Sequence, residues 1–198
     1  MTRWIEPVTL AGEHVVLEPL EARHGAGLAR AAADGELWRL WYTSVPAPER
    51  AGEYVGAALD MRETLSAMPF AVVGKASGEV IGSTRYFNVE PRHRRVEIGH
   101  TWYAKRAQRT GANTECKLLL LGHAFERLRA IAVEFRTSTF NQASQRAIER
   151  LGAKRDGVLR NHMILPDGTY RDTVVYSILE SEWPAVRRHL RFLLDRPR

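Results

Sequence analysis

The chain has 198 residues and a formal net charge of +6 at pH 7, with 44% hydrophobic and 26% charged residues. This composition is ordinary for a globular protein and argues against intrinsic disorder. The single cysteine, Cys116, excludes an internal disulfide and a multi-cysteine metal site. No apolar run is long enough to span a bilayer, and the first residues lack the apolar core of a signal peptide. We therefore expect one cytoplasmic domain over residues 1–198.

The basic residues are spread along the chain, with the densest clusters at 91–97 and 186–198. An isoelectric point of about 9.8 is compatible with nucleic acid, an acidic protein surface or an anionic small ligand. No aromatic residues alternate with the basic ones, as a surface for stacking bases would require. We therefore expect solvated turns and a solvated helix face, with no DNA or membrane partner.

The first half of the chain predicts a strand, helices and a β-meander. Residues 14–20 are rich in β-formers, and residues 22–41 predict one helix or two short ones, interrupted near Gly35. Prolines open a further helical segment over 45–66. Three strands at 69–75, 80–90 and 96–104 follow, joined by short turns.

The second half predicts a helix over 110–128, a strand over 132–139 and a helix over 141–153, which is capped by Asn141 and stopped by Gly152. A hairpin over 157–179 turns at 166–168, and a final helix covers 181–193. A meander followed by a β-α-β unit predicts an α/β (α+β) fold. We expect one mixed, mostly antiparallel sheet, a core at 8–179 and helices on both faces.

The segment from Trp102 to Glu115, where a strand passes into a helix, is the best candidate binding site. Helix amino ends expose unpaired N–H groups that bind phosphates. Gly111 would permit close approach of the backbone, and Arg109 adds a positive charge. The segment lacks the P-loop and three-glycine dinucleotide patterns, and an ordinary helix start explains it nearly as well.

At this point the sequence resembles the GNAT superfamily of N-acetyltransferases, in the Rim-type branch that acetylates ribosomal-protein amino termini. The family's loop reads Gln/Arg-x-x-Gly-x-Gly/Ala; Gln108 and Gly111 match it, and Asn113 departs from the final small residue. The family's later Asn-x-x-Ser/Ala segment ending in Leu-Gly is matched by Asn141, Ser144, Leu151 and Gly152. The order and spacing of these motifs carry the resemblance over residues 8–179.

The resemblance implies that acetyl-CoA lies between the strand ending at Tyr103 and the strand at 132–139, which splay apart. The backbone of Trp102 and Tyr103 would pair with the pantetheine arm, and Asn141 would hydrogen-bond to it. The expected cofactor-binding segment around the pyrophosphate comprises Gln108, Arg109, Thr110, Gly111, Ala112, Asn113 and Thr114. No metal is expected, because the seven histidines show no metal-ligand spacing.

Acetyl transfer to an amine needs a base, and Glu97, on the strand that leads to the loop, is our first choice because the family commonly places a glutamate there. A salt bridge from Glu97 to Arg94 or Arg95 is an equally good interpretation. His100 is the second choice for the base, although a buried, hydrogen-bonded histidine explains it better. Simple alternation puts His100 on the strand face opposite Glu97.

The tyrosine that many family members use to protonate the thiolate is replaced by Ile148. The resemblance to the Rim-type branch offers the Ser144 hydroxyl instead, although Ser144 as an ordinary first-turn residue is an equally good interpretation. Cys116 lies in an apolar helix without a histidine-carboxylate partner, so we expect a buried structural cysteine rather than a nucleophile.

Trp41, Arg85 and His100 are our candidates for contact with the acceptor. Trp38 and Trp41 would share a helix face, although core packing explains at least one of them better than substrate contact does. Arg85 could bind a carboxylate or a carbonyl. We expect direct attack by a primary amine, either a protein amino terminus or a small amine, in a ternary complex with acetyl-CoA. The alternative is a non-catalytic acetyl-CoA sensor or scaffold. The sequence leaves a monomer or a homodimer open.

Overall fold

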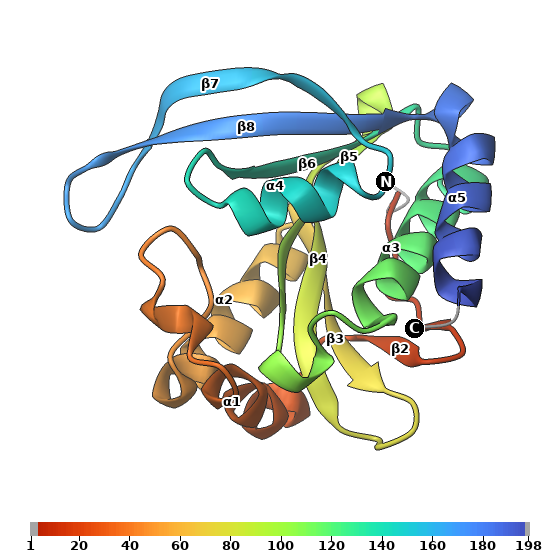
Figure 1. Ribbon diagram of the computed structural model, residues 1–198. Helices are drawn as coiled ribbons and strands as arrows, with labels where there is room; N and C mark the ends of the chain where they lie inside the picture. Colours follow the sequence, from red (N-terminus) through yellow and green to blue (C-terminus); the bar gives the residue numbers. More distant parts are fainter. Residues whose placement is uncertain (1–3, 197–198) are drawn as a thin grey trace.

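The computed structural model describes residues 4–196, whose centre is an eight-stranded sheet (Figure 1). Its order is β1-β2-β3-β4-β5-β6-β8-β7, and all neighbours are antiparallel except β5 and β6. The strands are β1 (Leu10–Ala11), β2 (Val15–Pro19), β3 (Ala67–Gly74), β4 (Val80–Glu90), β5 (Arg95–Tyr103), β6 (Ala132–Ser138), β7 (Lys154–Ile164) and β8 (Tyr170–Leu179). The predicted mixed, mostly antiparallel sheet is confirmed.

Helices cover both faces of this sheet, as expected (Figure 1). They are α1 (Gly25–Ala33), α2 (Ala51–Glu63), α3 (Ala112–Gly122), α4 (Gln142–Glu149) and α5 (Trp183–Asp195). α1 and α2 pack on one face around Leu28, Val55 and Trp102, and we call this the α2 face. α3 and α5 pack on the other face with Leu120 and Leu190, and we call this the α3 face.

The region 22–41 is interrupted at Gly35, as predicted, and only its first part forms an α-helix. α1 ends at Ala33, Gly35 adopts a φ of +99°, and only a short 3₁₀ turn at Leu37–Arg39 follows. Trp41 lies beyond that turn, so the expectation that it shares a helix face with Trp38 is wrong. The positive φ angles of Gly35 and Glu36 redirect the chain before a second helix can form.

The parallel strands β5 and β6 pair over three residues and then separate. Arg95 pairs with Ala132, Val96 with Val133 and Glu97 with Glu134. Beyond these positions, β5 continues against β4 alone and β6 against β8 alone within residues 4–196. The sequence order strand-helix-strand predicts such a parallel pair, and the structure shows the predicted splay as a loss of pairing after Glu97.

Candidate active site

The turn between β5 and α3 presents unpaired main-chain donors. The N–H groups of Gly111, Asn113 and Thr114 have no acceptor in the described part of the chain, because the first intrahelical bond runs from Glu115 N to Gly111 O. Ala112 N donates to Thr110 Oγ1 at 3.2 Å. The amino end of α3 therefore has the donors and the dipole orientation that suit an anionic ligand.

Several side chains of this segment stabilise the protein itself. Gln108 Nε2 donates to Tyr103 O at 3.0 Å, and Thr114 Oγ1 accepts from Arg150 Nη1 at 3.3 Å. A Cβ at Gly111 would lie 3.2 Å from the His14 ring and 3.5 Å from Leu194. Gly111 thus leaves room for these two neighbours, and its φ of −65° requires no glycine. Arg109 is exposed and has a φ of +59°.

The carboxyl half of β5 uses its side chains for packing on both faces. The Trp102 indole donates to Tyr54 Oη on α2 at 3.3 Å, while Tyr103 is buried in the core of the α3 face. The Tyr103 carbonyl already accepts from Gln108, so a ligand paired along β5 would have to use other main-chain groups or displace this contact.

The start of α4 keeps two polar groups without protein partners among residues 4–196. Asn141 Oδ1 accepts from Ser144 N at 3.0 Å and so caps the helix, as predicted. The Asn141 Nδ2 group and the Ser144 hydroxyl make no hydrogen bond within that range. Both groups follow β6 directly, at the end of β6 that has separated from β5.

Glu97 is a buried carboxyl group with a strongly perturbed pKa. Its side chain is 6% exposed on the α2 face, where Oε2 accepts from Asn88 Nδ2 at 2.8 Å and lies 3.5 Å from Arg136 Nε. Burial raises the pKa of Glu97 to about 7, against the opposing effect of Arg136. The expected salt bridge exists, but its partner is Arg136 rather than Arg94 or Arg95. A pKa near neutrality suits a general base.

His100 lies on the same sheet face as Glu97, so the expectation of opposite faces is wrong. The pairs Ser83–Trp102 and Arg85–Gly99 leave two residues of β5 opposite one of β4, and His100 takes a φ of +50° in this bulge. Its ring packs edge-on against Phe87, 5.1 Å between centroids. The extra residue in the bulge shifts the alternation of side chains by one position. Simple alternation from Glu97 to His100 therefore predicted the wrong face.

His100 is a poor base in this setting. Burial, with Arg85 and Arg171 nearby, lowers the pKa of His100 to about 4. A ring with so low a pKa is neutral at pH 7 and holds an abstracted proton weakly. Of the two candidates, Glu97 therefore has the pKa that is closer to that of a general base working near neutral pH.

Arg85 is 3% exposed, and its guanidinium lies 4.7 Å from the centre of the Tyr54 ring. Arg85 Nη1 contacts the Met61 sulfur at 3.3 Å, and Nε is buried without a hydrogen-bond partner. Arg171, which the sequence did not single out, also has a buried Nε without a partner. Arg171 lies two residues before Thr173 on a predicted strand, so the sequence shows that the two side chains share a face of that strand. It does not show which face of the sheet this is, because that depends on the register of β8.

Trp41 is 56% exposed and stands apart from this cluster. Its ring contacts Phe140, with 5.1 Å between the ring centroids. Phe140 immediately precedes Asn141, so Trp41 links the loop after the 3₁₀ turn to the start of α4. Of the three predicted acceptor contacts, the structure brings Arg85 and His100 together and places Trp41 at this separate position.

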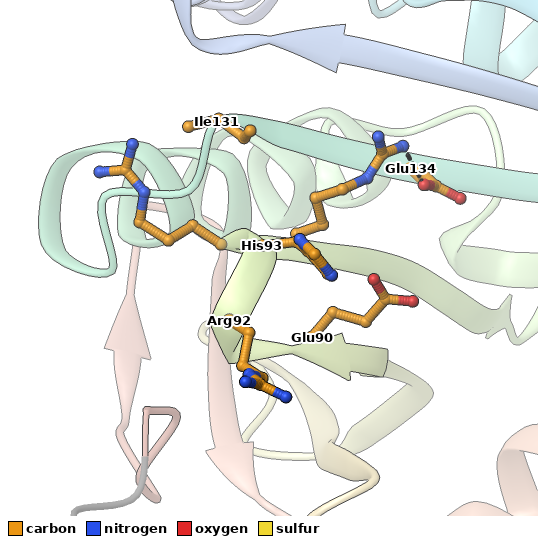
Figure 2. Close-up of a pocket in the computed structure, with 7 residues that line it drawn as sticks. Glu90, Arg92, His93, Ile131 and Glu134 are labelled. Atoms are coloured by element: carbon orange, nitrogen blue, oxygen red, sulfur yellow. Dashed lines mark hydrogen bonds and ion pairs between the residues drawn. The ribbon is translucent and has the colours of Figure 1, made fainter.

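A hollow of about 630 Å³ lies at the start of β5, at the opposite end of this strand from the amino end of α3. Figure 2 shows the side chains that line it. It is lined by Glu90, Arg92, His93, Arg94, Arg95, Ile131 and Glu134. Here Arg95 pairs with Glu134, which also pairs with Arg136 at 2.9 Å, so charged contacts run from the hollow to Glu97. The hollow lies where β5 and β6 are still paired and is separate from the divergence of the strands.

Lys117 is a second functional candidate that the sequence did not reveal. It is 4% exposed, and Nζ donates to Thr101 Oγ1 at 2.9 Å, beside the bulge of β5. Burial lowers the pKa of Lys117 to about 8. In the sequence it interrupts an apolar helix and gives no other sign. No group of three His, Cys, Asp or Glu residues able to hold a metal, and no helix able to span a membrane, occurs within residues 4–196.

Comparison with known proteins identifies the class. The family model for the acetyltransferase (GNAT) domain matches residues 14–154. The chain therefore belongs to the GNAT family and is an acetyltransferase, as the resemblance indicated; members of this family use acetyl-CoA as the donor. The uncharacterised N-acetyltransferase YoaA of Bacillus subtilis is 28% identical over 135 residues, 65% of this chain and 75% of YoaA.

Solved structures agree with this assignment. A T. thermophilus protein assigned to the acetyltransferases is 40% identical, with a TM-score of 0.84 over 96% of this chain and 99% of its own. A GCN5-related N-acetyltransferase from Brucella melitensis is 31% identical, with a TM-score of 0.85 over 96% and 86%. Mycobacterium smegmatis RimJ, in complex with CoA-disulfide, is 20% identical with a TM-score of 0.78 over 94% and 95%. At that identity RimJ shows the fold alone, so the Rim-type branch stays a prediction.

Proposed function

We propose that this chain transfers the acetyl group of acetyl-CoA to a primary amine by direct attack, with both substrates bound together. The observation that carries the proposal is the separation of β5 from β6 beside the unpaired amides that open α3. This arrangement provides an anion-binding helix end and, next to it, two strand edges with free main-chain groups.

On the donor side, the diphosphate of CoA fits the amides of Gly111, Asn113 and Thr114. These donors need no rearrangement of the protein, and the helix dipole favours the negative charge without a metal. Asn141 Nδ2 is free to donate to the pantetheine arm, because only its Oδ1 is used by the helix cap. The bound thioester supplies the activated acetyl carbon.

On the acceptor side, the amine nitrogen forms a bond to the acetyl carbon as the carbon-sulfur bond breaks. Glu97 accepts the proton that the nitrogen loses, directly or through water, and the Ser144 hydroxyl donates a hydrogen bond to the departing sulfur. The proton returns from Glu97 to the thiolate through solvent, so the products are an amide and free CoA and the enzyme is unchanged. Positioning of the two substrates supplies much of the remaining acceleration.

The first test removes one amide donor without removing a side-chain ligand. Asn113 is the second residue of α3, where proline is tolerated because its N–H has no intrahelical acceptor. We expect Asn113→Pro to weaken CoA binding roughly tenfold to hundredfold, the loss of one hydrogen bond to a charged group. Asn113→Ala, which keeps the amide, is the matched control and should bind as the wild type does.

Calorimetric titration with CoA and thiol release on an amine panel give the two readouts. Equal CoA binding by the proline variant, with unchanged thermal stability, would overturn the placement of the diphosphate. Tight CoA binding by the wild type with no turnover on any amine would favour a sensor or scaffold, the alternative that Ile148 at the usual tyrosine position suggests.

A further inference from the structure

Two arginines on the α2 face lack the carboxylate partners that their neighbours have. Arg95 and Arg136 both pair with Glu134. Arg85 and Arg171 form no ion pair in the part of the chain that the structure describes, and each keeps a buried, unpaired Nε. Burial of a guanidinium without an anion is costly, so such groups are expected to be paired or ligand-bound.

The fold holds Arg85 beside His100, and Arg171 near both His100 and Glu97. Arg85 pairs with Gly99 across β4 and β5, next to His100, and its guanidinium is fixed between Tyr54 and Met61. Arg171 lies near enough to influence the titration of both Glu97 and His100. Positive charge therefore lies beside His100 and near the carboxyl group that we propose as the base, where the acceptor amine must arrive.

We propose that Arg85 and Arg171 bind a carboxylate carried by the acceptor, so that the substrates are amines with a carboxylate close to the reacting nitrogen. This inference rests on the proposed function and specifies its acceptor. A guanidinium matches a carboxylate in shape and charge and can donate two parallel hydrogen bonds to it. The same two cations repel a polyamine or another polycation, so this class of acceptor is disfavoured.

Two sources supply this chemistry: a free amino acid, and a peptide whose first residue is acidic. The experiment therefore uses two matched pairs of acceptors. The first pair is an amino acid and its primary amide, and the second is a peptide beginning with aspartate and the same peptide beginning with asparagine. In whichever of the two pairs the enzyme acetylates faster, we expect kcat/KM to be roughly tenfold to hundredfold higher for the acceptor with the carboxylate than for its amide partner.

Arg85→Gln removes the charge, and Arg188→Gln on the exposed side of α5 is the matched control. In Arg85→Gln, kcat/KM for the carboxylate acceptor should fall to the value for its amide partner, while the amide partner changes little. The control should keep the full preference. An equal loss on both members of the pair would show that Arg85 supports the fold only, and would overturn the proposal.

A binding measurement separates this inference from the acetyl-transfer proposal. The N-acetylated form of each acceptor is titrated into the protein with CoA present, which requires no turnover. Carboxylate-selective binding that Arg85→Gln abolishes supports the site even if no amine is acetylated. Turnover of amines with no carboxylate preference, in rate or in binding, overturns the carboxylate site and leaves acetyl transfer standing.

Discussion

Glu97 gives the most direct test of the chemistry, because the pKa of its buried carboxyl, about 7, lies within the working range of an assay. Only the ionised carboxylate can accept a proton from the acceptor nitrogen. With a pKa of about 7, ~9% of the carboxyl is ionised at pH 6 and ~91% at pH 8. The rate of acetyl transfer under saturating substrates should therefore rise about tenfold between these pH values.

Two variants assign this rise to Glu97. Glu97→Gln removes the proposed base, so we expect its rate at pH 8 to fall by about 10²- to 10⁴-fold and its inflection near pH 7 to disappear. Glu134→Gln is the matched control, because Glu134 on β6 lies directly opposite Glu97 on β5 in the register of the two strands. Its negative charge helps to raise the pKa of Glu97, so its removal should move the inflection to lower pH while activity at pH 8 is kept.

The assay is thiol release at saturating acetyl-CoA and amine, from pH 5.5 to pH 9. Single-turnover measurements at each pH separate acetyl transfer from product release. An inflection near pH 7 that persists in Glu97→Gln would assign the titration to another group, such as the acceptor amine. An inflection unmoved in Glu134→Gln would contradict the electrostatic account.

Two further predictions follow from perturbed groups on the α2 face. Because the pKa of Glu97 is raised from 4.5 to about 7 on folding, its burial favours the protonated form, and the unfolding free energy should fall as the pH rises through this interval. Above pH 7 Glu97→Gln should be more stable than the wild type, by at most about 3 kcal/mol, and equally stable below pH 4.5; urea unfolding across pH checks this. Arg85→Gln should raise the pKa of His100 part of the way from about 4, because burial persists when one cation is removed; an unchanged value in an NMR titration of the ring would contradict their proximity.

Local sequence patterns and the order of the predicted elements were enough to predict much of the fold. Alternating strands, the meander, and the β-α-β order fix the mixed sheet and its parallel pair, because short connections leave few other arrangements. The residues Pro166, Asp167 and Gly168 predicted the turn at 166–168, and Gly168 does take a φ of +82°. Asn141 was likewise predicted as a helix cap. Both predictions succeed because a turn and a helix cap depend on the backbone of only a few consecutive residues.

Which side chains meet at the candidate site depends on how the strands pair, and the sequence of a single element does not show this. The bulge in β5 moves His100 to the α2 face, and alternation within the strand contains no sign of it. The ion-pair partner of Glu97 is Arg136 on β6, whereas neighbours in sequence pointed to Arg94 and Arg95. The sequence shows which residues are charged, but the register between strands decides which of them meet.

The surroundings of Cys116 favour direct attack over a covalent acetyl-enzyme. Cys116 is fully buried on α3, and burial raises the pKa of its thiol to about 11. At pH 7 a thiol with this pKa is ionised to about one part in 10⁴, and thiolate is the form that would attack a thioester. Glu97, in contrast, is on the face opposite α3 and titrates near neutrality. In the complex that we propose, the donor approaches from the α3 face and the amine from the α2 face where β5 and β6 separate, so no protein nucleophile is required between them.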